Sequence, residues 1–293
     1  KIWNAFRLIK GWTVDDNIQA PDAAKLAVHW FESKQNEVAA EVADLFSKYR
    51  LSEALMAVYK LFWDEFSSWY LEMIKPAYGQ GIDRTTYDAT LCFLDNLLHL
   101  LHPFMPFITE ELWQQMYERN AEEGESLMVS ALSMDTYVDT AFVAQFEVVK
   151  GVISNIRSIR LQKNIAQKEP LDLQVLGENP VAEFNAVIQK MCNLSSITVV
   201  ESKVEGASSF MVGTTEYAVP LGNMIDVEAE IARMEAELKH KEGFLQGVLK
   251  KLSNEKFVNN APAAVLEMER KKQADAESII SSLKESIAAL KKA

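Results

Sequence analysis

The sequence is poor in residues that break regular structure and in residues that crosslink it. Its 293 residues include only 11 glycines and 8 prolines, too few for the many turns of an all-β protein, so we expect long helices. The two cysteines, Cys92 and Cys192, form neither a zinc-ligand spacing nor a disulfide framework. Their isolation favours a reducing, cytoplasmic location.

A long apolar run and an initiator methionine are also absent. No stretch approaches the ~18 uncharged apolar residues of a membrane span, so we expect no membrane partner. The chain begins at Lys1 with a helical pattern, and it shows neither a signal peptide nor a leader. We therefore expect a fragment of a longer protein.

Positive charge is scarce and unevenly placed. The formal net charge is −12, and residues 1–140 carry 11 basic against 22 acidic side chains. Residues 230–293, in contrast, carry 12 basic and 10 acidic side chains. Because phosphate contacts need clustered Lys and Arg rather than a favourable total, the local clusters matter more than the net value.

The sequence shows no active site. Its four histidines lack metal-ligand spacing, and no glycine-rich phosphate loop is present. Adjacent carboxylates such as Asp64 and Glu65 point about 100° apart on a helix and cannot share one substrate atom. We expect no catalytic residue, no metal and no cofactor in this chain.

Three patterns divide the chain into a helical region at 1–140, a small α/β region at 141–226 and a coiled-coil region at 227–293. The fold class expected is mainly α. The first region is expected to be an antiparallel helical bundle, in which Leu51 to Ile74 form one helix ended by Pro76. A further helix is expected to start with Thr109 as its N-cap.

Alternation of apolar and polar residues marks the α/β region. It predicts strands at Leu171–Leu176 and Ser196–Val200, with the helix Val181–Cys192 between them. Ser209–Val212 and Glu216–Leu221 are typical of a hairpin. The region is expected to join the bundle to the coiled coil.

A heptad pattern runs through the last region. Apolar residues recur in alternating steps of three and four from Ile231 to Leu252, and again from Leu266 to Leu290. The break at Ser253–Pro262 predicts two helices folded back as an antiparallel hairpin.

The first fourteen residues contain no acid, within a region that is otherwise acidic. On a helix Trp3, Arg7 and Lys10 share one face, and Asn4 lies on its flank. An aromatic ring, two cations and an amide suit unstacked RNA bases and their phosphates. The alternative is that Trp3 packs into the bundle and the cations are solvated.

A second basic cluster lies at the far end of the predicted hairpin. Because the two helices are expected to be antiparallel, cations from before and after the turn come together there and suit a nucleic-acid backbone. The alternative is that these charges are simply solvated. The candidates are Lys250, Lys251, Lys256, Phe257, Arg270, Lys271 and Lys272.

Three segments carry a family resemblance: Lys1–Arg7 (KIWNAFR), Trp63–Glu72 (WDEFSSWYLE) and Leu101–Trp113 (LHPFMPFITEELW). Together they resemble the anticodon-binding helical domain of the class I aminoacyl-tRNA synthetases for Val, Ile and Leu. Asn155–Arg160 and Asn254–Pro262 are most similar to the valyl-tRNA synthetase family, which ends in a coiled-coil arm. One departure is Ser67-Ser68, where the family commonly has Cys-Asp.

The resemblance implies a tRNA-binding fragment, inactive alone, of an enzyme that attaches valine to its tRNA with ATP and Mg²⁺. The bundle would hold the anticodon stem and loop through Trp3, Asn4, Arg7 and Lys10, and the arm would contact the outer corner of the tRNA. Arg157 and Arg160 are weaker junction candidates. The implied partners are valine-accepting tRNA and the enzyme's own catalytic domain, with no DNA, in a cytoplasmic monomer.

Two alternatives stay open at this point. One is a helical scaffold that pairs with another protein through its coiled coil. The other is the equivalent region of an isoleucyl-tRNA synthetase, although two isolated cysteines cannot form the zinc module in which that enzyme often ends.

Overall fold

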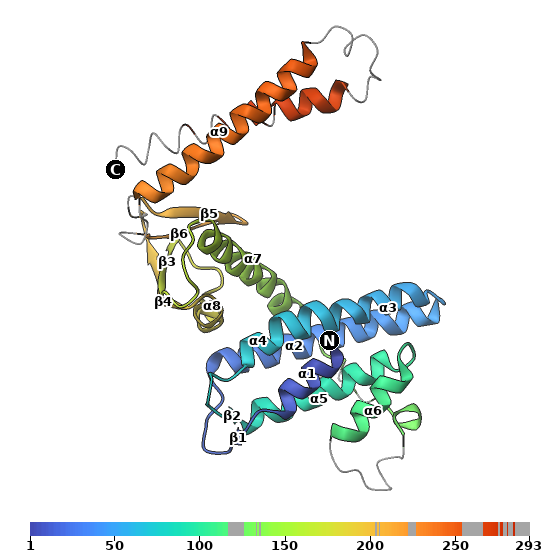
Figure 1. Cartoon of the computed structure of the whole chain (residues 1–293). Helices are drawn as coiled ribbons and strands as arrows, with labels where there is room; N and C mark the ends of the chain where they lie inside the picture. Colours follow the sequence, from blue (N-terminus) through green and yellow to red (C-terminus); the bar gives the residue numbers. More distant parts are fainter. Residues whose placement is uncertain are drawn as a thin grey trace. The chain divides into compact units, whose positions relative to one another are not determined.

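The structure of the chain is a computed structural model (Figure 1). It describes residues 1–116, 126–132, 134, 136–202, 204, 206–221, 227–253, 266–274, 276, 277, 280 and 284, and for residues 227–234 and 237 it describes the backbone only. The protein is mostly helical with a small sheet region, which confirms the expected fold class at that level.

Two compact units make up the chain. The first unit comprises Lys1–Ile159, Ala166–Lys203 and Ser209–Val219, and the second comprises Arg160–Ile165, Val204–Ser208 and Pro220–Ala293. Each unit is described by itself.

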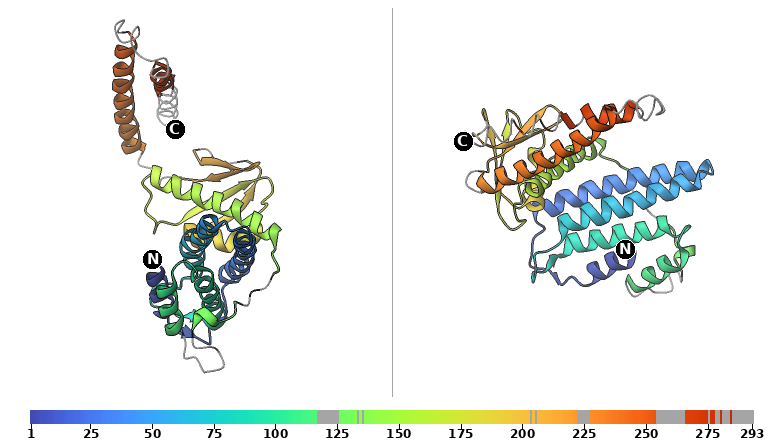
Figure 2. Two further views of the ribbon diagram at one scale, coloured as in Figure 1. Left: turned by 90° about the vertical axis from the view of Figure 1, so that its right-hand side faces the viewer. Right: turned by 45° about the horizontal axis from the view of Figure 1, so that its top comes forward.

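Helices form most of the first unit. In chain order they are α1 (Ile2–Lys10), α2 (Asp22–Ser47), α3 (Leu51–Lys60), the π-helical stretch η1 (Leu61–Tyr70), α4 (Leu71–Ile74), α5 (Arg84–Leu101), α6 (Pro106–Met116), the short 3₁₀ turn η2 (Leu127–Val129) and α7 (Thr140–Gln162, which ends in the second unit). Helix α2 packs against α3, η1, α4 and α5, and Figures 1 and 2 show α2 and α3 side by side.

The single helix predicted from Leu51 to Ile74 is continuous but changes its winding. α3, η1 and α4 follow one another without a break, and the middle ten residues are π-helical. The N–H of Leu71, for example, donates to the carbonyl of Phe66, five residues earlier. Periodicity in the sequence predicts a helix but not this widening.

Aromatic rings from three helices form the core between α2, η1 and α5. Phe31 of α2 lies 4.9 Å from Tyr70 and 5.1 Å from Phe93, measured between ring centroids. The Tyr70 hydroxyl and the Thr90 hydroxyl are 2.8 Å apart, which satisfies both polar groups inside the core. Burial raises the pKa of Tyr70, so the hydroxyl stays protonated.

Two short strands that lie far apart in the sequence pair with each other. Strands β1 (Val14–Asp15) and β2 (Ile82–Asp83) form a short parallel ladder. A Cβ at Gly81 would lie 3.0 Å from the carbonyl oxygen of Thr13, so the close approach of the two strands favours glycine.

The predicted N-cap at Thr109 is wrong. Helix α6 already begins at Pro106, because proline lacks an N–H and suits the first turn of a helix. Thr109 lies inside the helix, where its hydroxyl donates to the carbonyl of Met105 at 2.8 Å.

A four-stranded sheet completes the first unit, in the order β4-β3-β6-β5. Its elements are β3 (Leu171–Leu176), η3 (Ala182–Phe184), α8 (Asn185–Cys192), β4 (Leu194–Val200), β5 (Ser208–Val212) and β6 (Thr215–Val219). β3 pairs with β4 in parallel across the crossover through α8, and with β6 antiparallel. The strands, the helix between them and the hairpin agree with the predicted elements.

One face of the sheet is covered by helices. Leu171, Leu173 and Val175 alternate as buried residues along β3. Gly151 of α7 approaches Val212 of β5 so closely that a Cβ would lie 3.0 Å from its side chain. Figure 2 shows α7 along the sheet.

The second unit contains α9 (Val227–Leu252) and helical residues 266–274. Val248, Ala276 and Ile280 are buried apolar positions of this unit. Lys256 and Phe257 lie outside the described residues.

Replacing Asp83 by alanine tests how α5 begins. The buried Asp83 side chain accepts a hydrogen bond from the N–H of Thr86 at 2.8 Å. Loss of such a cap lowers the free energy of unfolding by about 1–2 kcal/mol, which urea denaturation followed by circular dichroism measures. Asp16→Ala is the control, since Asp16 forms only an exposed pair with Arg84 and its loss should leave stability unchanged. Equal losses in both variants would contradict this cap.

Candidate nucleic-acid interface

Helix α1 is amphipathic and exposes the polar face that the sequence predicts. Ala5, Phe6 and Ile9 are buried against the rest of the unit. Trp3, Asn4 and Arg7 are exposed, and Trp3 keeps 40% of its surface accessible. The first unit therefore brings all four residues predicted on this helix to its surface, since Lys10 is exposed as well.

Lys10, the fourth residue, already has a partner. Its ammonium donates to the carbonyl of Met116, at the end of α6, at 2.9 Å. The contact joins α1 to α6 across 106 positions of sequence. A lysine held in this way has fewer donors to offer to a phosphate than Arg7 has.

Beside α1 lies a groove of about 320 Å³, which we call the aromatic groove. Its walls come from α1, from α3 and η1, and from the segment that runs from the end of α5 into α6. The lining residues are Lys1, Ile2, Trp3, Leu55, Tyr59, Phe62, Trp63, Leu101, Met105 and Ile108.

Stacked rings form one wall of the aromatic groove. The rings of Tyr59 and Trp63 lie 5.4 Å apart between centroids and 14° from parallel. Tyr59 is 44% and Trp63 38% exposed. The Lys1 ammonium lies 3.6 Å from the centroid of the Trp63 ring, a cation–π contact, and 3.4 Å from the Trp63 carbonyl oxygen.

The charge of the aromatic groove differs from that of the unit around it. Among the described residues, Lys1 is the one charged residue that lines it, and none of the lining residues is a carboxylate. A neighbouring groove of about 370 Å³ between α2 and α3 is lined by Glu41, Glu53 and Glu65 as well as by lysines. Three carboxylates repel a polyanion, so the aromatic groove is the better of the two for nucleic acid.

Flat, partly exposed rings beside a cation are suited to unstacked nucleobases. Base–aromatic stacking contributes about 1–3 kcal/mol per base and tolerates any base. The same geometry offers few hydrogen-bonding groups inside the groove. It can therefore hold a base by its face, while Asn4 and Arg7 lie outside the lining set.

Two residues of this wall, Tyr59 and Trp63, were missed by the sequence reasoning. The helical spacing in the sequence predicts one core stripe, made of Leu55, Val58, Phe62, Phe66, Trp69 and Met73. Val58, Phe62, Phe66 and Met73 are buried, but Leu55 is 38% exposed, so its assignment to the core is wrong. A second stripe at intervals of four residues, Leu51, Leu55, Tyr59 and Trp63, is partly exposed along its length. The four-residue spacing of this second stripe is the sequence pattern that could have identified Tyr59 and Trp63.

In the second unit, one carboxylate neutralises part of the predicted basic cluster. Glu269 is buried and lies 2.7 Å from Lys272 and 3.9 Å from Lys251. Lys250, Arg270 and Lys271 are exposed. The exposed cations are therefore the better candidates for contact with phosphate.

The two arginines predicted at the junction differ in exposure. Arg157 is exposed, and its guanidinium carbon lies 5.5 Å from the ring centroid of Trp69. Arg160 is only 2% exposed. A side chain buried to this extent does not reach a nucleic acid, so we leave Arg160 out of the contact set.

Comparison with known proteins identifies the family. The family described as the anticodon-binding domain of tRNA ligase matches residues 28–175, about half of the chain. The chain belongs to this anticodon-binding family. The match contains Tyr59, Trp63 and Met105 of the aromatic groove. A second family, described as the valyl tRNA synthetase tRNA binding arm, matches residues 226–291.

Individual relatives agree with both matches. A valine–tRNA ligase of Bacteroides thetaiotaomicron is 99% identical over 293 residues, which are 100% of this chain and 33% of that protein. Valine–tRNA ligases of Phocaeicola vulgatus and Enterococcus faecalis are 72% and 35% identical, over 100% and 99% of this chain and 33% and 34% of theirs. The chain thus spans about a third of the length of these relatives.

Neither a metal site nor a membrane helix is found in the described part of this anticodon-binding chain. Its described His, Cys, Asp and Glu residues form no group that could hold a metal ion. Among the same residues, no helix combines the length and the apolarity needed to cross a bilayer.

Acid titration tests the ion pairs of Glu269. The hydrogen bond from Lys272 lowers the pKa of Glu269 below its ordinary value of 4.5. A carboxylate with a lowered folded-state pKa stabilises the fold above its unfolded pKa, and this stability is lost as pH falls through the folded pKa. The stability difference between the unaltered chain and Glu269→Gln should be full at pH 7 and shrink below pH 4.5, as measured by urea denaturation.

The control for this titration is Glu267→Gln, two residues away and exposed. Its loss should change the stability little, because an exposed carboxylate contributes little to it. A difference for Glu269→Gln that stays constant from pH 7 to below pH 4.5 would contradict the assigned pairs.

Proposed function

We propose that this chain is the tRNA-binding part of a valine–tRNA ligase, and that its first unit holds the anticodon stem and loop. The observation that carries this proposal is the aromatic groove, an acid-free stacking surface in a strongly acidic region. The family match over residues 28–175 supports the same function.

In this proposal an unstacked anticodon base lies in the aromatic groove. Trp3, Tyr59 and Trp63 supply ring faces, and Lys1 supplies a positive charge beside the base. Asn4 and Arg7 contact base edges or phosphates at the rim, and Lys10 contributes less because Met116 holds it.

The second unit is proposed to be the arm that contacts the outer corner of the tRNA. Two ion pairs support the antiparallel hairpin predicted from the heptads: Lys251 with Glu269, and Glu242 with Lys284 at 2.9 Å. From Glu242 to Lys251 the residue number rises, while the number of the partner falls from Lys284 to Glu269. Two helices paired in this order run antiparallel. The exposed Lys250, Arg270 and Lys271 would then contact phosphates.

The proposal also includes the division of the chain into three regions and the activity of the whole enzyme. Residues 1–140 form the anticodon-binding antiparallel bundle, 141–226 the junction, and 227–293 the arm. The whole enzyme, a cytoplasmic monomer, attaches valine to its tRNA with ATP and Mg²⁺ through a catalytic domain outside this chain. The chain alone binds tRNA without charging it.

Removing rings from the groove tests the anticodon function. Trp63→Ala and Trp3→Ala should each weaken binding of a valine anticodon stem–loop RNA by about 1–3 kcal/mol, because each removes a stacking surface. Fluorescence anisotropy with labelled RNA measures the affinity.

Tyr78→Ala is the matched control, since Tyr78 is fully exposed and outside the groove. It should bind the RNA as the unaltered chain does. If the three variants lose equal affinity, or if none loses any, the groove does not bind the anticodon loop.

Salt titration tests the arm with full-length valine tRNA. Each phosphate contact contributes about 0.9 to the slope of log affinity against log salt. Changing Lys250, Arg270 and Lys271 together to Gln should therefore lower the slope by about two to three. Lys272→Gln, whose ammonium is bound to Glu269, should change it little. An unchanged slope in the triple variant would contradict an arm contact.

A further inference from the structure

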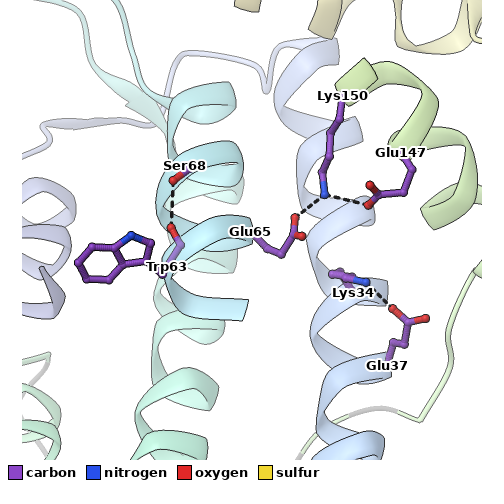
Figure 3. A network of polar contacts seen from close by, with 7 residues as sticks. All are labelled: Lys34, Glu37, Trp63, Glu65, Ser68, Glu147 and Lys150. Carbon is purple, nitrogen blue, oxygen red and sulfur yellow. Dashed lines mark hydrogen bonds and ion pairs between the residues drawn. The ribbon is translucent and has the colours of Figure 1, made fainter. Parts of the chain in front are cut away.

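A largely covered lysine lies on the side of η1 opposite the aromatic groove. The Lys150 ammonium, on α7, is 2.6 Å from Glu65 of η1 and 2.8 Å from Glu147. The Lys150 and Glu65 side chains are only 12% and 18% exposed, whereas Glu147 is 56% exposed. Figure 3 shows the three residues together; we call them the lysine network.

Aromatic rings hold the lysine in place. Its ammonium lies 5.2 Å from the ring centroid of Trp30, 5.8 Å from Trp69 and 5.7 Å from Phe146. Such contacts strengthen as water is excluded. Lys150 is therefore a fixed point on α7 to which Glu65 is bound.

Glu65 and Trp63 are two residues apart and leave η1 on opposite sides (Figure 3). Residues at this spacing on a helix do not face each other. Glu65 contacts α7, while Trp63 lines the aromatic groove. A rotation of η1 about its axis would break the contact between Glu65 and Lys150, and it would move the Trp63 ring in the aromatic groove.

The winding of η1 makes such a rotation possible. π-Helical stretches are rare and short because their hydrogen-bond geometry is unfavourable compared with that of an α-helix. The hydroxyls of Ser67 and Ser68 donate to the carbonyls of Phe62 and Trp63, five residues earlier, at 2.8 and 3.0 Å. These bonds stabilise the wide turn from within, and the bond to Lys150 restrains it from outside.

We propose that Lys150 is a positioning residue for nucleobase binding: through Glu65 it sets the rotation of η1 and hence the position of the Trp63 ring in the aromatic groove. The binding consequence rests on the proposed anticodon function. The effect of Lys150 on the position of the Trp63 ring does not rest on that function, and it is measured separately.

The first readout needs no RNA. In the 293-residue chain labelled with 5-fluorotryptophan, the ¹⁹F resonance of Trp63 is assigned by its loss in Trp63→Phe. Lys150→Met should shift this resonance, and Lys150→Arg, which restores a cation, should return it toward its original position.

Lys34→Met is the matched control. It removes the same charge from a lysine that donates its hydrogen bond, at 2.8 Å, to Glu37 on its own helix, while Glu65 of η1 acts on it through charge alone. It should leave the Trp63 resonance unshifted. An unshifted resonance in Lys150→Met would overturn the proposal. Glu65→Gln, which leaves Lys150 its pair with Glu147, gives the same test if Lys150→Met does not fold.

The second readout is a double-mutant cycle on anticodon stem–loop binding. Lys150→Met should weaken binding about tenfold in the unaltered chain and less than about twofold when Trp63 is already alanine. Equal losses in the two backgrounds would mean a general structural effect and would overturn the positioning role. If Trp63→Ala alone has no effect on binding, the proposed function fails, while the ¹⁹F result still decides the positioning role.

Discussion

The helical run from Leu51 to Ile74 carries more apolar surface than its neighbours can cover. Its core stripe, with Val58, Phe62 and Phe66, is buried in the first unit, whereas the stripe that contains Leu55, Tyr59 and Trp63 stays partly exposed. A contiguous exposed apolar patch of this kind is typical of a binding groove. The remaining features of the site follow from where this second stripe lies.

Helix α1 converts that exposed stripe into a groove. It packs through Phe6 and Ile9, and it places Trp3 beside the stripe without bringing a carboxylate. The absence of acid at the start of the sequence thus acquires a structural meaning, because Lys1, Ile2 and Trp3 form one wall of the groove. A net charge of −12 is compatible with RNA binding when the local charge is arranged in this way.

The periodicity of apolar residues predicted the helices and strands that depend on the spacing of their own residues. The strand Leu171–Leu176 and the continuous helix from Leu51 to Ile74 are examples, since each is decided by the spacing of its own residues. The pairing of β1 with β2 and the bond from Lys10 to Met116 depend on contacts between distant segments. The π-helical winding of η1 is restrained in part by such a contact, from Lys150 to Glu65, and in part by the local bonds of Ser67 and Ser68. A single sequence does not reveal which distant segments are in contact.

The same limit applies to the site residues. Trp3, Asn4 and Arg7 were predicted because their charges and ring stand out in the local sequence. Tyr59 and Trp63 were not, because an apolar residue on a helix is assigned to the core until a structure shows which stripe is covered. Arg160 shows the reverse case, a charged residue expected at the surface and found buried.

Photocrosslinking tests the central claim most directly. A valine anticodon stem–loop whose loop uridines are replaced one at a time by 5-iodouridine, irradiated in complex with the chain, forms adducts with the rings that contact the base. The account predicts an adduct on Trp3, Tyr59 or Trp63 from at least one loop position, mapped by mass spectrometry of the peptides. Adducts confined to residues outside the aromatic groove, such as the exposed Phe107 or Tyr78, would contradict it.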